Sequence, residues 1–332
     1  MERNRLILIF SLIILVFAFI YLLSPILDGI LMGVALAYAV RPLHTRLSRR
    51  VGEGVSAFLS TMIISLPLLL FFAYGVFQGV TELIVVMKNL ETYVAILNSY
   101  LNSLDPDISR TVRPALNQFV AVFNTKIGDL AFSVTTKFIF FVMNFLISTI
   151  VCFYVIIDGK TVTRKIIDRV FPEKEVGDFF EEFDSVLMNL WFGNFLFALL
   201  MGIVSIPYFM AFGIPYVPLL SGLMFLAALI PVFAEWMVIL PLTLYLVFMD
   251  WVKAAWFLAI GSVFLYIIPE LILRPYFVGY TSKIHPLVLM LSFLGGGLAA
   301  GVTGFFISPM LAAFLTAVYN HYTKQSGNSA AN

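Results

Sequence analysis

The chain has 332 residues, of which 61% are hydrophobic and 12% are charged, and its formal net charge is +1. A soluble domain is about half apolar and about a quarter charged, so this composition indicates a protein that lies largely in a membrane. The near-neutral balance and the lack of a basic tract give no basis for nucleic-acid binding, and a single cysteine, Cys152, excludes an intrachain disulfide and a multi-cysteine metal site.

Apolar stretches recur along the chain at lengths that suit a bilayer. About 20 helical residues cross a hydrocarbon core of about 30 Å. The sequence predicts membrane spans at 6–23, 26–40, 55–80, 138–157, 186–212 and 254–273. No small-residue cleavage pattern follows the first run, and Pro25 leads directly into the second. The first run is therefore interpreted as an uncleaved span rather than a signal peptide.

Basic residues gather at alternate ends of these spans. Arg3 and Arg5 precede the first span, and Lys324 lies near the end of the chain. Other clusters follow the second, fourth and sixth spans: Arg41, Arg46, Arg49 and Arg50; Lys160, Arg164, Lys165 and Arg169; Arg274 and Lys283. The positive-inside rule puts all of them on the cytoplasmic face if each span crosses once. We expect a multi-pass protein of the cell membrane with cytoplasmic N- and C-termini.

The segment between the third and fourth spans has a different pattern. Apolar residues recur there at alternating steps of four and three, first from Leu83 to Leu104 and again from Val112 to Val134. Asp105, Pro106 and Asp107 between them form a turn signal. The pattern predicts an αα-hairpin outside the membrane. Its seam can join the two helices to each other or to the membrane part, or it can join the protomers of a homo-oligomer.

The C-terminal part contains an internal repeat. Residues 207–241 align without a gap to residues 275–309, at an offset of 68. The identical pairs include three prolines and three aromatic residues: Pro207/Pro275, Tyr208/Tyr276, Phe209/Phe277, Pro218/Pro286, Leu219/Leu287, Leu223/Leu291, Phe225/Phe293, Leu226/Leu294, Ile239/Ile307 and Pro241/Pro309. A duplicated unit in an apolar chain is typical of transporters built from paired halves.

Each unit combines one span with a long apolar stretch that is interrupted in its middle. The interruptions are 230–235, which contains Pro231, and 295–304, which begins with Gly295, Gly296 and Gly297. Each half-stretch has about 15 residues, or about 22 Å of helix, which is short for a crossing. A hairpin that returns to its own side makes the second unit upside down relative to the first. The glycines suit exposed hairpin tips, or helix packing through the pair Gly297 and Gly301.

The expected architecture is all-α, with about six to eight transmembrane helices, two broken helical hairpins in an inverted repeat, and an extramembrane αα-hairpin. Its parts are the first three spans (1–80), the extracytoplasmic hairpin (81–137), the fourth span with a cytoplasmic connector (138–184), the first repeat (185–251), the second repeat (252–320) and a disordered cytoplasmic tail (321–332).

Ionisable and polar residues within the apolar units are candidates for a transport path, because they are costly there. Glu235 lies at the first tip, at the position that Thr303 takes in the second, and is either a polar cap or an ion-coupling carboxylate. Glu270 and Arg274 are one turn apart and form either a structural clamp or a site for a coupling H⁺ or Na⁺. Asn194 suits a hydrogen bond across helices or a place on the path. No structural metal or cofactor is expected, beyond transient Na⁺ near either glutamate.

Three segments resemble one known family. They read SPILDGILMGVALAYAVRPL, IPYVPLLSGLMFLAALIP and LILRPYFVGYTSKIHPLVLMLSFLGGGLAAGVTGFFISPMLAAF, and the likeness runs from about Leu6 to Tyr319. They are similar to the AI-2E family of transporters, also called the autoinducer-2 exporter or PerM-like permease family. The resemblance implies export of autoinducer-2 or Na⁺(Li⁺)/H⁺ antiport, by a homo-oligomer. The chain departs from the family at Gly193-Asn194, where Gly-Gln is usual, and at 231–234, where Pro-x-x-Gly is usual.

Two functions from different classes fit these features. The first is a secondary transporter of a small solute or monovalent cation, working by alternating access and coupled to H⁺ or Na⁺. The alternative is a passive channel or pore formed by a homo-oligomer. Motifs of membrane proteases and lipases, HExxH and GxSxG, are absent from the sequence, as is the phosphate-binding loop of a primary pump, so neither an enzyme nor an ATP-driven pump is expected.

Overall fold

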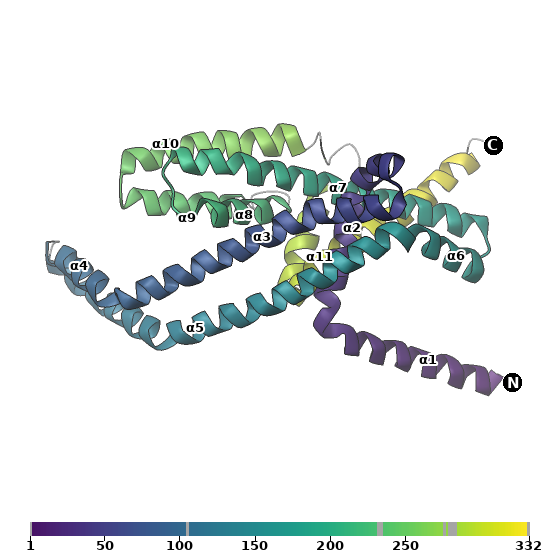
Figure 1. The fold of residues 1–332 in the computed structure, drawn as a ribbon, viewed down its shortest axis with the longest axis horizontal. Helices are drawn as coiled ribbons and strands as arrows, with labels where there is room; N and C mark the ends of the chain where they lie inside the picture. The colour runs from purple at the N-terminus through teal and green to yellow at the C-terminus, as the bar shows by residue number, and fades with distance from the viewer. Residues whose placement is uncertain (1, 104–105, 231–234, 275–276, 278–283, 331–332) are drawn as a thin grey trace.

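The computed structural model describes residues 2–103, 106–230, 235–274, 277 and 284–330 (Figure 1). Every secondary-structure element among them is a helix. Six helical segments are long and apolar enough to cross a membrane: Phe10–Val51, Glu53–Thr81, Thr135–Val170, Lys174–Ala211, Trp251–Leu273 and Pro286–His321. The prediction of a polytopic all-α membrane protein is therefore confirmed.

The first two predicted spans correspond to two helices separated by a sharp bend. Helix α1 (Glu2–Leu23) is followed by the short turn η1 (Ser24–Ile26), and α2 (Leu27–Val51) begins directly after it. Pro25 lies in this turn and lacks the N–H that a continuing helix would need. In Figure 1, α1 projects away from the other helices.

A close contact between α2 and the later helix α5 (Pro106–Tyr154) holds the N-terminal part together. Gly29 and Gly33 lie one turn apart on α2. A Cβ on Gly29 would come within 2.5 Å of the carbonyl oxygen of Asn144, and one on Gly33 within 2.6 Å of that of Ser148. The Gly29 N–H, free at the start of a helix, donates instead to Asn144 Oδ1 at 2.8 Å. This is the small-xxx-small packing that membrane helices use for close approach.

The αα-hairpin is formed by helices that continue out of the membrane spans. Helix α3 (Glu53–Lys88) leads into α4 (Leu90–Ser103), which packs on α5. Figure 1 shows this arm extending far to one side of the bundle. The sequence has no helix-breaking residue at 80–81 or 137–138, where the predicted membrane spans meet the predicted outer hairpin. The helices therefore continue without interruption from the spans into the hairpin.

The remaining helices include the segments for which the sequence predicts a repeat. After α5 come η2 (Val155–Gly159), α6 (Lys160–Val170) and the long helix α7 (Lys174–Ala211). The first interrupted stretch forms α8 (Val217–Ala228) and α9 (Trp236–Val247), of 12 residues each. The next span consists of α10 (Trp251–Gly261), η3 (Ser262–Ile267) and η4 (Pro269–Leu273), and the chain ends in α11 (Pro286–Ala330). Helix α11 thus continues into the segment 321–332, for which the sequence predicts disorder.

Helix α11 is folded back on itself. Its helical path breaks at Ala300 (φ −142°) and at Gly301, whose φ of +59° and ψ of −137° are open to glycine alone. The backbones of Gly296 and Gly304 touch, so that a Cβ on either would collide with the carbonyl of the other. In a straight helix these residues would be about 12 Å apart. The contact therefore shows that the two halves of α11 form a tight hairpin.

The glycine pair that approaches closely differs from the predicted one. Around the Cβ position of Gly301 there is open space, and Gly297 meets only Phe305, at 3.9 Å. Of the two interpretations of the glycines, packing within the chain through Gly297 and Gly301 is thus not observed. The chain turns at Gly301, and residues four apart cannot share a packing face across a turn.

The two repeat spans run antiparallel and side by side. The Tyr208 hydroxyl on α7 donates to the Phe257 carbonyl on α10, while Asn194, earlier on α7, meets Arg274, at the end of η4. As the residue number rises along one span, its partner's number falls along the other, which defines the opposite directions. The main hydrophobic core is built around this pair together with α2, α5, α8 and α9.

Candidate functional site

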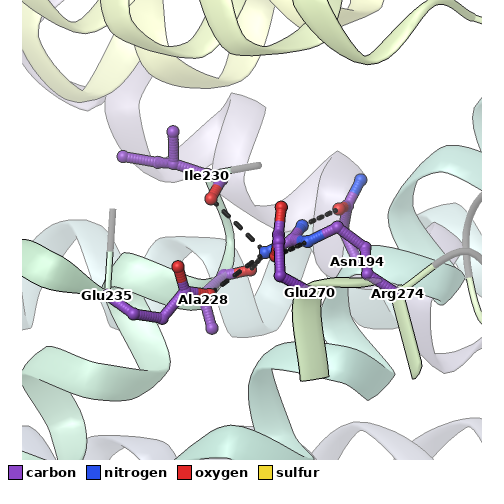
Figure 2. Close-up of polar contacts among 6 residues, drawn as sticks. All are labelled: Asn194, Ala228, Ile230, Glu235, Glu270 and Arg274. Atoms are coloured by element: carbon purple, nitrogen blue, oxygen red, sulfur yellow. Dashed lines mark hydrogen bonds and ion pairs between the residues drawn. The ribbon is translucent and has the colours of Figure 1, made fainter. Parts of the chain in front are cut away.

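A buried charged cluster lies where the second repeat span meets the break of the first hairpin (Figure 2). Arg274 is at its centre and is 6% exposed. Its Nε donates to Glu270 Oε2 at 2.6 Å, its Nη1 to Asn194 Oδ1 at 3.2 Å, and its Nη2 to Glu235 Oε1 at 3.4 Å. Four predicted site residues from three separate segments are therefore brought together.

The broken hairpin explains why a cation sits here. Helix α8 ends at Ala228, and the last carbonyls of a helix have no intrahelical partner. Arg274 Nη2 donates to the Ala228 carbonyl at 2.9 Å and to the Ile230 carbonyl at 3.4 Å. Glu235 lies on the other side of the break, at the N-terminal end of α9, where the helix dipole favours a negative charge. The guanidinium and this carboxylate thus complement both helix ends that the break exposes.

Helix α7 supplies the opposite wall of the cluster. The Asn194 side chain is fixed because its Nδ2 donates to the Leu190 carbonyl at 2.9 Å, which leaves Oδ1 to accept from Arg274. Phe197, one turn later, lies beneath the guanidinium, with Arg274 Cζ 4.1 Å from the ring centroid. A cation over an aromatic face gains about 2 kcal/mol when both are desolvated. The Arg274 position is therefore set by α7, α8 and α9 together.

Glu270 approaches from the last turns of its own span. Pro269 has no N–H, so the regular hydrogen-bond ladder cannot continue through it, and the helix widens to a π-helical turn over Pro269–Leu273. Glu270 and Arg274 remain on one face of that turn and form an ion pair, which confirms their predicted contact. Both side chains of the pair are 8% exposed.

The cluster carries more negative than positive charge. One guanidinium faces the carboxylates of Glu235 and Glu270, so that the three groups sum to one negative charge when all are ionised. Glu235 is 1% exposed, and its Oε2 has no hydrogen-bond partner among the described residues. The indole Nε1 of Trp191, one turn before Asn194, also has no hydrogen-bond partner among the described residues. A buried excess charge is costly unless a bound cation or proton balances it.

The depth of the cluster follows from its place on α7. Asn194 lies about 7 Å along the helix axis from the midpoint of the apolar segment 186–212. The half-thickness of a hydrocarbon core is about 15 Å. The ion pairs are thus within the apolar layer of the span rather than at its end. Ionisable residues at such depth are costly and therefore indicate a candidate functional site.

The second break has a polar contact of its own, apart from the charged cluster. Thr303, the counterpart of Glu235, donates its hydroxyl to Asp28 Oδ1 at 2.5 Å. Asp28 is in the first turn of α2, and its contact with the second hairpin was not predicted. Gly295, Gly296 and Gly297 lie on the first arm of this hairpin, before the turn. Of the predicted site residues, Pro231 is outside the described part of the chain.

The described residues contain no group of three or more His, Cys, Asp and Glu side chains that could hold a metal ion. Two carboxylates, those of Glu235 and Glu270, contact Arg274. Sequence reasoning missed Phe197, Trp191 and the Ala228 carbonyl. Nothing in a single sequence marks an aromatic ring or a main-chain oxygen as a partner of a distant arginine.

The fold and the buried cluster define a multi-pass α-helical membrane protein with ionisable groups between broken helices. The model of the AI-2E transporter family matches residues 9–324. The chain belongs to the AI-2E family of transporters.

Relatives of similar length share most of the chain. A protein of Archaeoglobus fulgidus, named as a candidate transport protein, is 44% identical over 96% of this chain and 95% of its own length. The candidate transport protein MJ1177 of Methanocaldococcus jannaschii is 25% identical over 90% of this chain and 91% of its own. The candidate transport protein YrrI of Bacillus subtilis is 26% identical over 91% of this chain and 88% of its own. These names indicate transport and give no substrate.

Proposed function

We propose that the protein is a secondary transporter that moves a small solute or monovalent cation across the cell membrane by alternating access, coupled to H⁺ or Na⁺. The observation that carries the proposal is the cluster of Glu235, Glu270 and Arg274. It is buried, it lies at a helix break, and it has one more carboxylate than cation.

The charge imbalance gives the cluster two states. With a proton or Na⁺ on Glu235 the three groups are neutral overall, and without it they carry one negative charge. Glu235 Oε2 is the atom that takes the proton or cation, because Oε1 already accepts from Arg274. A ligand shifts a conformational equilibrium by its difference in affinity between the two states. Occupancy of Glu235 therefore biases how firmly Arg274 holds the ends of α8 and α9.

Alternating access further requires two broken hairpins that open to opposite sides, in an inverted repeat. The antiparallel course of α7 and α10 supports this arrangement. So do the matched prolines, since Pro218 and Pro286 each start the first arm of a hairpin, and Pro241 and Pro309 each lie within the second arm. Helices α8 and α9 are each about 18 Å long, which suits a hairpin that enters the membrane and returns.

Labelling of introduced cysteines tests the inversion. The native Cys152 is buried, so a membrane-impermeant thiol reagent reports on the introduced residue. Pro218→Cys should be labelled from the outer side and Pro286→Cys from the cytoplasmic side. Labelling of both from one side would rule the inverted arrangement out.

We also propose that the outer arm, α4 with the start of α5, forms the contact between copies of the chain in an oligomer. Ile96 on α4 and Val112 and Val122 on α5 are between 41% and 49% exposed, although they lie in a segment that the proposal puts in water. Exposed apolar side chains on an extramembrane helix pair favour contact with further copies of the chain. A homo-oligomer joined through the arm is therefore included in the proposed working form.

A transport panel in sealed proteoliposomes tests the function. It should include Na⁺, Li⁺ and small polar organic solutes of the autoinducer-2 type, each with and without a proton gradient. The proposal predicts saturable flux of at least one class, driven uphill by the gradient. Flux that does not saturate and never exceeds equilibrium would instead support a passive pore.

A further inference from the structure

A further polar site, separate from the charged cluster, lies between α2, α6 and α7. It is a pocket of about 580 Å³. Its lining includes Arg41, Arg46 and Arg49 from α2, Lys160 from the start of α6, and Asp184 from α7. Four cationic side chains and one carboxylate give the pocket a charge of +3.

Part of this pocket is held in a fixed shape. Arg41 Nη1 donates to both oxygens of Asp184, at 2.9 and 2.8 Å, and the Tyr38 hydroxyl donates to Asp184 Oδ1 at 3.0 Å. This contact ties α2 to α7 and uses the only acidic side chain of the lining. The charges of Arg46, Arg49 and Lys160 are therefore not balanced within the pocket. All three side chains are exposed.

The pocket lies at the level where the apolar spans end. The apolar part of α2 ends at Val40, and that of the fourth span ends at Ile157. Lys160 is about 5 Å beyond the second point and Arg46 about 9 Å beyond the first, measured along their helices. Bilayer headgroups occupy a layer of roughly 5–8 Å on each side of the hydrocarbon core. Long basic side chains from these positions reach that layer.

Helix α6 gives independent evidence for a membrane surface at this level. Val162, Ile166 and Val170 recur every four residues and form one stripe, and they are 49%, 57% and 59% exposed. Lys165 and Arg169 of the same short helix flank this stripe, while Lys160 and Arg164 lie on its far side. A helix with an exposed apolar stripe and basic residues beside it lies in the plane of the membrane interface. The pocket opens beside the start of this helix.

We propose that the pocket binds the phosphate group of an anionic phospholipid headgroup. Guanidinium groups offer paired N–H donors that match phosphate oxygens, and Lys160 adds a compact charge from the opposite side. Basic pockets between membrane helices on the cytoplasmic side suit lipid headgroups. Free inorganic phosphate shares this chemistry, but it would not use the apolar stripe of α6. The lipid is therefore the occupant that both observations favour.

Binding is tested on the purified full-length protein in a neutral detergent. The probes are dioctanoyl phosphatidylglycerol, dioctanoyl phosphatidylcholine and inorganic phosphate, titrated by microscale thermophoresis. The double variant Arg46→Gln/Arg49→Gln removes two pocket charges. Its control, Arg50→Gln/Lys165→Gln, removes the same charge from exposed positions outside the pocket lining. Lys160→Gln tests the pocket from a second helix and stays informative if the double variant folds poorly.

Saturable binding of phosphatidylglycerol is expected, with phosphatidylcholine and inorganic phosphate at least tenfold weaker. The pocket double variant should lose about tenfold in affinity, Lys160→Gln about threefold, and the control less than twofold. Equal losses in the two double variants would overturn the proposal in favour of general surface attraction. Phosphate binding as tight as that of the lipid would assign the pocket to a free anion instead.

Discussion

Replacement of Arg274 by methionine should destabilise the protein strongly. The guanidinium is 6% exposed and contacts two carboxylates, one amide oxygen and two main-chain carbonyls. Methionine preserves most of the volume but removes the cation that pairs with Glu235 and Glu270. Breaking a buried ion pair from one side costs about 3–5 kcal/mol. A chain of this size loses roughly 2 °C of melting temperature per kcal/mol, so we expect a fall of about 6–10 °C.

The assay is thermal unfolding of the purified protein followed by size-exclusion chromatography with fluorescence detection. Arg50→Met is the matched control, because Arg50 is exposed on the surface of α2, and it should shift the melting temperature by no more than about 1 °C. Adding Glu270→Gln to Arg274→Met removes one of the two carboxylate charges and should recover part of the loss. A melting temperature for Arg274→Met equal to that of the control would refute the account of the cluster.

Three further changes test other parts of the structure in the same assay. Gly304→Ala should lower the free energy of unfolding by about 1–3 kcal/mol, because its Cβ collides with the Gly296 carbonyl. The control Gly295→Ala, whose Cβ has nothing within 4 Å, should be neutral or slightly stabilising. Equal effects would contradict the folded hairpin of α11. Gly33→Val should open the contact between α2 and α5 and lower the melting temperature by several degrees. The control Gly54→Val, whose surroundings are open, should not. A tolerated Gly33→Val would mean that these helices are not in close contact. Tyr208→Phe should cost about 1 kcal/mol through loss of the hydrogen bond to Phe257, and no change would argue against the pairing of α7 with α10.

Local features of the sequence predict the helices and their breaks well. Apolar length marks the spans, and glycine and proline mark both interrupted hairpins. The predicted turn at Asp105, Pro106 and Asp107 falls where α4 gives way to α5, although Asp105 lies outside the described residues. Glu270 and Arg274 are predicted as a pair because four residues on a helix bring two side chains to one face. All of these predictions depend on residues near one another in the chain.

Contacts between distant segments could not be predicted in the same way. Arg274 meets Asn194 and Glu235 across 80 and 39 residues, and Asp28 meets Thr303 across 275. Their positions depend on how the helices pack. Spacing alone also misleads, because Gly29 and Gly33 pack closely on a continuous helix. Gly297 and Gly301 have the same spacing, but the helix breaks at Gly301, so the two residues do not lie on one helical face.

We propose that Glu235 binds the ion that drives transport, and coupled flux in proteoliposomes tests this role most directly. For the substrate that the panel identifies, an imposed proton or Na⁺ gradient should drive wild-type protein to accumulate it above equilibrium. Glu235→Gln removes the charge that the ion balances, and it should abolish uphill accumulation while any downhill flux remains. Glu181→Gln, the same chemical change at an exposed position on α7, should behave as wild type. Uphill accumulation by Glu235→Gln at the wild-type level would contradict the account.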